Sequence, residues 1–507
     1  MSAELHFPGL VRSAGEVSAR GARLAGGLLR LGLREGDVLA VLTRNDPVVC
    51  DVVLACRTAG VYYCPINWHF TPEEARFIIE DSGAKALLIS ADLLTPLAPC
   101  LSNALPLLVC NLPDDHTQMQ VETASQRMQA YEPWLAKQPT YDGPVVAPRG
   151  HMAYTSGTTG RPKGVRRLAP APDQVAAYGR VMDALVTQCF GVTEGSRVLV
   201  PAPLYHSAPA VITQQALRRG ALLVIQPRFD PEETLRLIAA HRIDVVYMVP
   251  TMYVRLLKLP EAVRAKYDTS SLRFIASTGS PCPADVKRAM IAWLGPVVYE
   301  TYAASETGLL TLMTSEDALR KPGSAGRPAG QAVIRIVSES GEACPTGVAG
   351  LVYMRQPAYT DFTYVGNDAA RARIERDGLV TLGDMGYLDE DGYLFIVDRL
   401  SDMVISGGVN IYPAEIEQAL IGCPGVLDCA VVGIPDAEMG EKLLAVVEPE
   451  AHATLTLTAI DAWLRPRLAG YKIPRELALG TLPRDPNGKI AKRKVRAAYW
   501  EGRTRRV

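Results

Sequence analysis

One loop, residues 154–164, concentrates side chains that could bind an anion. It reads Tyr-Thr-Ser-Gly-Thr-Thr-Gly-Arg-Pro-Lys-Gly. Its small residues let backbone N–H groups approach an anion, its hydroxyls add donors that rotate to fit, and Lys163 adds a positive charge. The other positions expected to contact phosphate are Thr155, Ser156, Gly157, Thr158 and Thr159. The loop is not a P-loop, because no Gly-Lys-Ser/Thr follows, and a flexible surface loop has a similar composition.

Length and composition indicate a globular protein of two or more domains. The chain has 507 residues, of which 48% are hydrophobic and 21% charged, and this length exceeds one compact core. A net charge of −1 favours neither nucleic acid nor a membrane as a partner. We identify no signal peptide and no apolar run long enough to span a membrane. The ten cysteines lack a C-x-x-C pair and are expected to be reduced core residues of a cytoplasmic protein.

Helices and strands are expected to alternate from the N-terminus onward. Short apolar runs predict buried strands at residues 38–42, 61–67, 86–90, 105–109, 221–225, 244–250 and 272–277. Amphipathic stretches predict helices at residues 12–33 and 47–59, and capped helices after Thr71 and Asp230. This alternation is typical of mostly parallel sheets covered by helices, whose ligands bind beyond the carboxyl ends of the strands. The polar segment 111–147 is expected to be a long surface connection.

The predicted fold class is α/β with two domains. The N-terminal domain, residues 1–400, is expected to combine several helix-covered parallel sheets with a β-rich subdomain after about residue 320. The C-terminal domain, residues 401–507, is expected to be a small α+β unit, since strands at 429–433 and 443–448 flank helical patterns.

The phosphate-binding loop is followed by eight further motifs in a fixed order. They lie at residues 203–206, 302–307, 323–328, 383–387, 398–402, 406–411, 413–417 and 487–490. Order and spacing together resemble the signatures of the adenylate-forming superfamily, which includes acyl-CoA synthetases, aryl-CoA ligases, luciferases and peptide-synthetase adenylation domains. The resemblance implies that a carboxylate attacks the α-phosphate of ATP, and that a thiol then attacks the acyl-adenylate. It also implies ATP, Mg²⁺ and coenzyme A as cofactors.

The resemblance assigns catalytic roles to four residues. Lys489 resembles the lysine that reaches the substrate carboxylate and the α-phosphate during adenylation, where a cation between two anions lowers the barrier. Glu306 resembles the magnesium ligand, and Lys163 belongs to the phosphate-binding loop. His206 follows the pattern of the aromatic gate beside the acyl pocket, although a lone histidine there could equally be structural.

Further residues resemble the contacts of the family to the nucleotide and to CoA. Asp384 and Arg399 correspond to the ribose contacts, and Tyr302 to the ring beside adenine. The remaining nucleotide contacts implied are Gly279, Ser280, Pro281, Glu300, Thr301 and Ser305. In relatives the small domain rotates about a position equivalent to Ser401, which makes this domain mobile. The rotation presents the Ser406, Gly407 and Gly408 turn to the pantetheine tunnel.

Several features leave alternatives open. Residues 165–168 replace the usual Thr/Ser-His pair of the family, which puts the contact of that pair in question. The N-terminus is shorter than in most relatives, so a dimer surface or an edge element could be missing, and a homodimer is one possible state. Ala303 stands where acetate-specific relatives carry a tryptophan, which leaves room for a larger acid. A basic cluster near the C-terminus is either a solvated helix face or a surface for the CoA phosphates; it comprises Lys492, Arg493, Lys494 and Arg496.

The sequence therefore predicts an acid–CoA ligase that converts an apolar aliphatic or aryl carboxylic acid, with ATP and CoA, to acyl-CoA, AMP and pyrophosphate. Two alternatives remain: an adenylating enzyme with another acceptor, such as a carrier-protein thiol, and a nucleotide- or acyl-binding protein without turnover. His206 occupies the place where amino-acid-adenylating relatives carry an aspartate, which argues against an amino acid as substrate.

Overall fold

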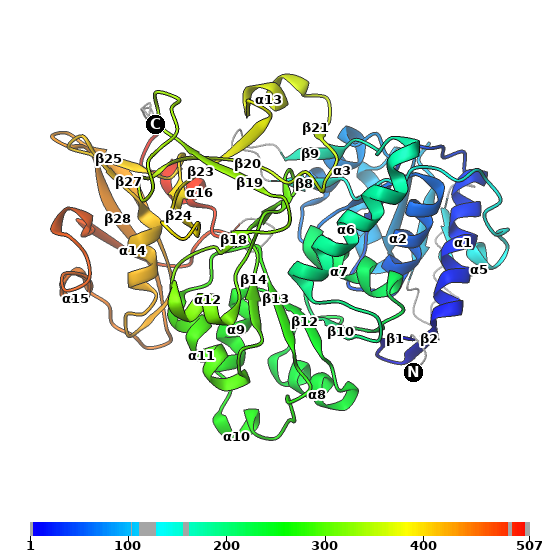
Figure 1. Ribbon diagram of the computed structural model, residues 1–507, viewed down its shortest axis with the longest axis horizontal. Coiled ribbons are helices and arrows are strands. Elements are labelled where there is room, and N and C mark those ends of the chain that lie inside the picture. The colour runs from blue at the N-terminus through cyan, green and yellow to red at the C-terminus, as the bar shows by residue number, and fades with distance from the viewer. Residues whose placement is uncertain (1–3, 103, 111–127, 156–161, 485–488, 502–507) are drawn as a thin grey trace. The chain divides into compact units, whose positions relative to one another are not determined.

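The computed structural model describes residues 4–102, 104–110, 128–155, 162–484 and 489–501 (Figure 1). Contacts between Cα atoms divide the chain into two compact units. Unit 1 comprises residues 1–333 and 355–378, and unit 2 comprises residues 334–354 and 379–507. The predicted domain boundary at residues 400–401 stays a prediction.

The larger sheet of unit 1 has seven strands in the order β14-β13-β12-β10-β11-β1-β2. They are β1 (Glu4–Phe7), β2 (Leu10–Ser13), β10 (Arg197–Val200), β11 (Leu222–Ile225), β12 (Val245–Met248), β13 (Phe274–Ser277) and β14 (Val298–Glu300). All neighbours are parallel except β1 and β2. The helices of this region are α6 (Val175–Phe190), α7 (Ser207–Arg218), α8 (Pro231–His241), α9 (Pro250–Leu257), α10 (Glu261–Arg264), α11 (Ala284–Leu294) and α12 (Ser315–Arg320). Segments that follow the parallel strands meet at one edge of the sheet.

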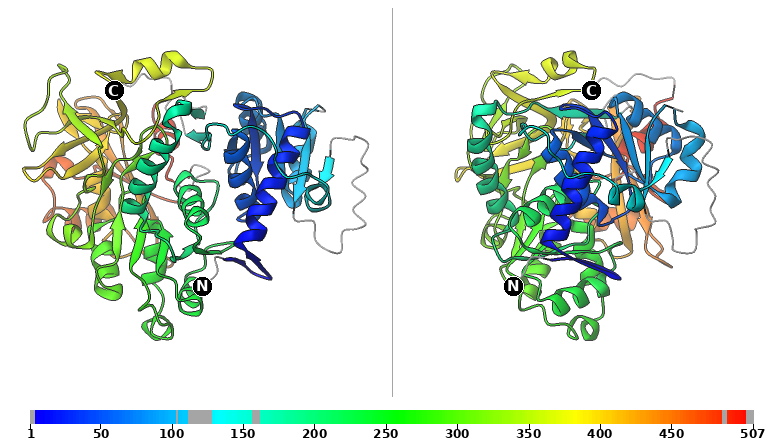
Figure 2. Two further views of the ribbon diagram at one scale, coloured as in Figure 1. Left: turned by 45° about the vertical axis from the view of Figure 1, so that its right-hand side comes forward. Right: turned by 90° about the vertical axis from the view of Figure 1, so that its right-hand side faces the viewer.

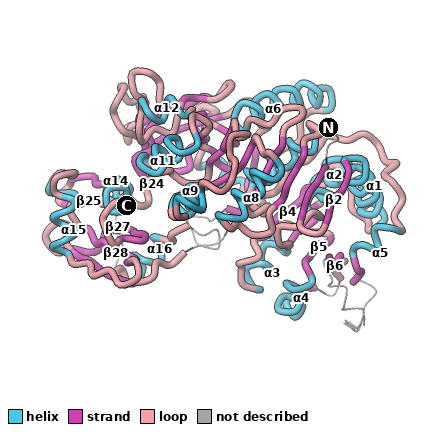
Figure 3. The backbone as a smooth tube through the Cα atoms, turned by 90° about the horizontal axis from the view of Figure 1, so that it is seen from below, coloured by secondary structure: helices cyan, strands magenta, loops and turns pink. Residues whose placement is uncertain are grey.

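A second sheet of unit 1 is entirely parallel, in the order β4-β3-β5-β6-β7. Its strands are β3 (Val38–Leu42), β4 (Tyr62–Pro65), β5 (Ala86–Ser90), β6 (Leu107–Cys110) and β7 (Met128–Ala130). Its helices are α1 (Ala14–Arg30), α2 (Val48–Ala59), α3 (Pro72–Asp81), α4 (Ala91–Leu97) and α5 (Tyr131–Ala136). Alternate residues of β3 belong to different cores: Leu39 and Val41 pack on the side of α1 and α2, and Ala40 on the side of α3 and α4 (Figure 3).

Local signals start and stop these helices as predicted. Thr71 caps α3 with a complete capping box, and Pro72 occupies the first turn. Asp230 accepts a hydrogen bond from the backbone N–H of Glu233 at the start of α8. α2 ends at Gly60, whose φ of 67° lies in the left-handed region that favours glycine.

The interpretation of segment 111–147 as a surface connection is wrong for its middle part. Residues 128–136 form β7 and α5, and Tyr131 and Trp134 are 1% and 7% exposed. α5 packs against α1 (Figure 2), where a Cβ atom on Gly27 would lie 2.4 Å from the Trp134 ring. The apolar side chains at 131, 134 and 135 follow helical spacing. Residues 111–127 lie outside the described residues.

Short antiparallel elements complete unit 1. A three-stranded sheet has the order β21-β9-β8, formed by β8 (Ala153–Thr155), β9 (Lys163–Arg167) and β21 (Phe362–Tyr364). Two-residue strands form the pairs β15 (Ala303–Ala304) with β16 (Gly308–Leu309), and β17 (Thr311–Leu312) with β18 (Arg327–Pro328). α13 (Asp368–Arg373) and β22 (Glu375–Arg376) follow β21.

Unit 2 contains two sheets. The first is five-stranded, in the order β19-β20-β23-β22 with β24 beside β23; besides β22 it includes β19 (Val333–Val337), β20 (Gly350–Arg355), β23 (Leu379–Leu388) and β24 (Leu394–Arg399). The second has the order β26-β25-β28-β27, with β29 beside β28; its strands are β25 (Val404–Ser406), β26 (Val409–Ile411), β27 (Val426–Asp436), β28 (Gly440–Pro449) and β29 (Glu476–Leu479). Its helices are α14 (Pro413–Leu420), α15 (Leu457–Leu464) and α16 (Lys492–Ala497). The predicted α/β fold class, with its parallel sheets and β-rich parts, is confirmed.

All ten cysteines are free thiols, and eight of them are buried, including Cys50, Cys56, Cys64 and Cys110. Within the described part of the chain, no helix is both long enough and apolar enough to span a bilayer.

Candidate active site

The predicted phosphate-binding loop is flanked by an antiparallel pair of strands, β8 and β9. Thr155 at the end of β8 lies opposite Lys163 at the start of β9. A Cβ atom on Gly164 would lie 2.7 Å from the Tyr154 ring, so only glycine lets the two strands approach here. Ser156, Gly157, Thr158 and Thr159 lie outside the described residues, so their predicted phosphate contacts stay predictions.

Lys163, Glu306 and Tyr364 form one cluster in unit 1. The Lys163 ammonium lies 5.3 Å from the centroid of the Tyr364 ring, and the Tyr364 hydroxyl donates a hydrogen bond to Glu306 Oε1 at 3.1 Å. Glu306 is only 8% exposed. The structure thus brings together the predicted phosphate cation and the predicted metal carboxylate. Sequence reasoning missed Tyr364, because it belongs to none of the motifs.

The donor set at Glu306 fits a magnesium ion carried by a nucleotide. Mg²⁺ is commonly bound by one or two carboxylates together with substrate phosphates, and Glu306 supplies one such carboxylate. No group of three His, Cys, Asp or Glu side chains able to hold a metal gathers among the residues that the structure describes.

The predicted adenine contacts follow two neighbouring parallel strands. Gly279, with φ of 99°, comes just after β13, and Thr301 comes directly after β14, so both lie at the carboxyl edge. The backbone N–H of Thr301 donates to the Ser277 carbonyl at 2.8 Å, and that of Tyr302 donates to Thr311 Oγ1 at 3.1 Å. These bonds fix the segment that precedes Ser305, whose hydroxyl lies 3.4 Å from that of Ser207.

Glu300 differs from its neighbours, because its side chain is occupied within the protein. Its carboxylate lies 2.6 Å from the Lys287 ammonium of α11, and both side chains are at most 10% exposed. Its backbone N–H and carbonyl both bond to Met313. Burial raises the pKa of Glu300, and Lys287 opposes that rise. The side chain and backbone of Glu300 are thus both engaged within the protein, and its predicted nucleotide contact stays a prediction.

His206 belongs to a cluster of aromatic rings. It occupies the N-cap position of α7, its ring centroid lies 4.3 Å from that of Tyr205, and the Trp68 ring meets Tyr205 edge-on at 4.7 Å. Trp68, in the loop between β4 and α3, was not singled out from the sequence. The gating role of His206 stays a prediction.

Asp384 and Arg399, the predicted ribose contacts, lie opposite each other on β23 and β24 of unit 2. Arg399 Nε donates to Asp384 Oδ1 at 3.1 Å, and the two side chains are 57% and 9% exposed. Because the arginine is largely in solvent, the ion pair contributes little to stability. The nearly buried carboxylate of Asp384 is thus paired with a guanidinium that is exposed to solvent.

Ser406, Gly407 and Gly408 form the tip of the hairpin between β25 and β26. Ser406 pairs with Val409, and the two glycines between them have φ of 56° and 80°. Positive φ at both central residues is the requirement of a type I′ turn, which explains the Gly-Gly pair. Residue 488, which precedes Lys489, lies outside the described residues; Lys489 is exposed and precedes the bridge between Arg484 and Ile490.

The interpretation of the C-terminal basic cluster as a solvated helix face is wrong for two of its members. Lys492 lies 2.8 Å from Glu417, and its side chain is 16% exposed. Arg496 donates to the Ser401 carbonyl at 3.1 Å and lies 3.4 Å from Asp402. Both residues attach α16 to unit 2, whereas Arg493 and Lys494 are exposed.

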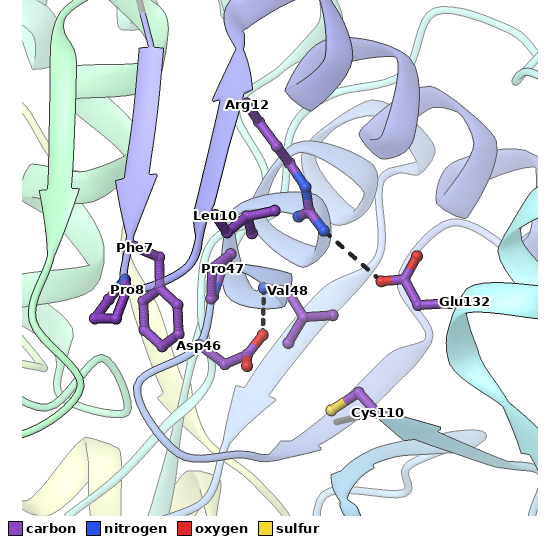
Figure 4. A pocket seen from close by; sticks show the side chains of 9 residues that line it. All are labelled: Phe7, Pro8, Leu10, Arg12, Asp46, Pro47, Val48, Cys110 and Glu132. Atoms are coloured by element: carbon purple, nitrogen blue, oxygen red, sulfur yellow. Dashed lines mark hydrogen bonds and ion pairs between the residues drawn. The ribbon is translucent and has the colours of Figure 1, made fainter. Parts of the chain in front are cut away.

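A cavity of about 230 Å³ lies in unit 1 beside the hairpin of β1 and β2 (Figure 4). Its lining is Phe7, Pro8, Leu10, Arg12, Asp46, Pro47, Val48, Cys110 and Glu132. The close-up shows Arg12 directed at Glu132, 3.8 Å away, and Asp46 bonded to the backbone of Val48. Its charged groups thus engage one another or the backbone, and the lining includes none of the predicted site residues.

His151 should make stability depend on pH. Burial, and then the charge of Arg167, lower its pKa to about 4 from 6.5. As the pH falls from 7 to 4, the unfolded chain therefore binds a proton before the folded protein does, which lowers the free energy of unfolding by about 2–3 kcal/mol. Urea unfolding at both pH values should show this extra loss in the wild type relative to His151→Gln. An equal decrease in the free energy of unfolding of the wild type and of His151→Gln between pH 7 and pH 4 would contradict this prediction.

Comparison with known proteins identifies the family. The AMP-binding enzyme family matches residues 7–361, and the AMP-binding enzyme C-terminal domain matches residues 415–489. A feruloyl-CoA synthase of an Amycolatopsis species is 35% identical, with 96% of this chain and 93% of the relative covered. The long-chain-fatty-acid–CoA ligase FadD13 of Mycobacterium tuberculosis is 31% identical, with 96% and 92% covered.

A solved structure agrees with these relatives. The O-succinylbenzoate coenzyme A synthetase MenE of Bacillus subtilis, in complex with ATP and magnesium ion, superimposes with a TM-score of 0.80 at 26% identity, covering 96% of this chain and 95% of that one. The chain therefore belongs to the AMP-binding enzyme family. The predicted resemblance is confirmed, and so is the predicted class, an adenylate-forming enzyme of the acyl-CoA synthetase type.

Proposed function

We propose that this protein is an ATP-dependent acid–CoA ligase that forms an acyl-adenylate from an apolar aliphatic or aryl carboxylic acid and transfers the acyl group to CoA. The observation that carries the proposal is the cluster of Lys163, Tyr364 and Glu306 at the base of the phosphate-binding loop. In this cluster Lys163, the cation that we propose for the phosphates, lies near the buried carboxylate of Glu306, which we propose for their metal ion. Family membership, and relatives named for feruloyl-CoA and for long-chain fatty acids, support the same reaction.

Each residue then has a defined task. Lys163 and the loop hold the phosphates, Asp384 accepts hydrogen bonds from the ribose hydroxyls, and Tyr302 lies against the adenine. Mg²⁺ held by Glu306 would neutralise negative charge on the phosphates. Lys489 places its ammonium between the substrate carboxylate and the α-phosphate during adenylation.

The second half-reaction uses other groups of the small domain. We propose that residues 401–507 rotate about Ser401, so that Lys489 leaves and the hairpin tip at Gly407 and Gly408 approaches the pantetheine arm. The absence of side chains on these glycines permits that approach. The ten free thiols favour a reducing compartment, so we propose a cytoplasmic location.

A panel of carboxylic acids assayed for pyrophosphate release, with and without CoA, tests the reaction. The proposal expects release that depends on an apolar acid, with acyl-CoA appearing only when CoA is present. Adenylation without consumption of CoA would indicate another acceptor, such as a carrier-protein thiol. No release with any acid would indicate a binding protein without turnover, and would contradict the proposal.

Asp384→Ala should weaken ATP binding. The ribose hydroxyls would lose a charged acceptor, and a hydrogen bond to a charged group is worth about 1.5–3 kcal/mol, or about 10- to 150-fold in affinity. Calorimetric titration with ATP measures the loss, with Asp391→Ala, an exposed turn residue between β23 and β24, as the control. Equal affinities for the wild type and Asp384→Ala would remove Asp384 from the nucleotide site.

A further inference from the structure

Two side chains from one β-ribbon hold the segment that carries Glu306. β9 and β21 pair in antiparallel fashion, with Tyr364 opposite Val165 and Phe362 opposite Arg167. The ribbon begins at Lys163 of the phosphate-binding loop. It therefore connects the loop to Glu306, which lies 143 residues further along the chain.

Arg167 donates hydrogen bonds to the two peptide carbonyls on either side of the Glu306 Cα atom. Its Nη2 donates to the carbonyl oxygens of Ser305 at 2.7 Å and Glu306 at 3.0 Å, and its Nη1 donates to that of Thr360 at 3.1 Å. The guanidinium lies 4.5 Å from the centroid of the Tyr359 ring. A planar fork of donors that also stacks on a ring is specific to arginine, and lysine cannot reproduce it.

The turn after Glu306 packs against the same ring. Gly308 has φ of 77°, and a Cβ atom there would lie 2.2 Å from the Tyr359 ring. Tyr359 therefore contacts both Arg167 and the backbone that follows Glu306. The backbone around Glu306 therefore contacts the Tyr359 ring and the Arg167 guanidinium, both of which are distant from it in sequence.

Tyr364 holds the carboxylate itself. Its hydroxyl donates a hydrogen bond to Glu306 Oε1 at 3.1 Å, and Tyr364 as a whole is only 5% exposed to solvent. A phenol is protonated near neutral pH, so the Tyr364 hydroxyl is the donor of this bond.

We propose that Arg167 and Tyr364 are positioning residues for the metal carboxylate: Tyr364 orients the side chain of Glu306, and Arg167 fixes its backbone. The inference rests on the proposed function, in which Glu306 holds Mg²⁺. Arg167 lies in the stretch, residues 165–168, that replaces the Thr/Ser-His pair expected from the resemblance to the family. Partners that orient a metal ligand typically contribute about 10- to 100-fold in metal affinity.

The test uses Mn²⁺ in place of Mg²⁺ and measures equilibrium binding. Electron paramagnetic resonance of free Mn²⁺ gives the affinity for Mn²⁺–ATP, and calorimetry with a chelator gives the affinity for metal-free ATP. Tyr364→Phe removes the hydroxyl that donates to Glu306 and keeps the ring beside Lys163. Arg167→Lys keeps the positive charge and removes the planar set of guanidinium donors. Both should weaken Mn²⁺–ATP by about 10- to 100-fold and leave metal-free ATP unchanged. The matched control, Arg166→Lys, should change neither.

The outcomes separate this inference from the proposed function. Two results would contradict the metal role of Glu306, and the inference with it. One is that the wild type binds Mn²⁺–ATP no more tightly than metal-free ATP. The other is that Glu306→Gln still binds Mn²⁺–ATP more tightly than metal-free ATP. If Glu306→Gln abolishes this gain in affinity while Tyr364→Phe and Arg167→Lys retain it, only the positioning roles are overturned. Equal weakening of ATP with and without metal in both variants would also overturn them, because it would indicate damage to the nucleotide site as a whole.

Discussion

Lys489→Ala should fail in adenylation and succeed in thioester formation. In the first half-reaction the ammonium matters most as charge moves from the carboxylate to the α-phosphate, and removing one preorganised donor from such a site costs about 10²–10³ in rate. In the proposed mechanism the small domain has turned before the second half-reaction, so that Lys489 points away from the reacting atoms. We therefore expect that the mutant releases pyrophosphate about 10²–10³ times more slowly, yet converts supplied acyl-adenylate and CoA at close to the wild-type rate.

The comparison of the two half-reactions contains its own control. A destabilised fold would impair both, because both require the same acyl pocket. Lys442→Ala, which removes another lysine of unit 2 from β28, provides a matched substitution that should affect neither half. Equal losses in both halves for Lys489→Ala would mean that this lysine is structural, or that the small domain does not alternate between two positions.

Ala303→Trp should shift the preferred acid from large to small. Ala303 lies in β15, opposite Leu309 of β16, and is partly buried against the main core of unit 1. An indole there would fill space that an alanine leaves to the acyl group. Overpacking costs about 1–3 kcal/mol, or about 10- to 200-fold in selectivity. We expect kcat/KM for the best large acid to fall by that factor relative to acetate.

The measurement is a competition series of acids of increasing size, with Ala303→Gly as the control that adds no bulk. Ala303→Gly should keep the wild-type order of preference. A mutant Ala303→Trp that processes its best large acid as well as the wild type does would show that Ala303 does not line the pocket.

Local sequence determined the elements of this protein and the order of its motifs. The capping residues Thr71 and Asp230 and the stop at Gly60 act within one helical turn, so their signals are readable from neighbours in sequence. The apolar runs of the parallel strands are equally local, because burial on both faces requires continuous apolar residues. The phosphate-binding loop was recognisable for the same reason: its chemistry lies in one contiguous stretch.

Tertiary structure alone decided which polar groups meet. Tyr364 and Arg167 reach Glu306 only because β9 pairs with β21, and no periodicity near any of the three residues encodes that pairing. Sequence reasoning likewise missed two ion pairs, Glu300 with Lys287 and Lys492 with Glu417. A charged side chain is buried only where the fold supplies a partner, and that partner is a property of long-range contacts rather than of the residues beside it in the chain.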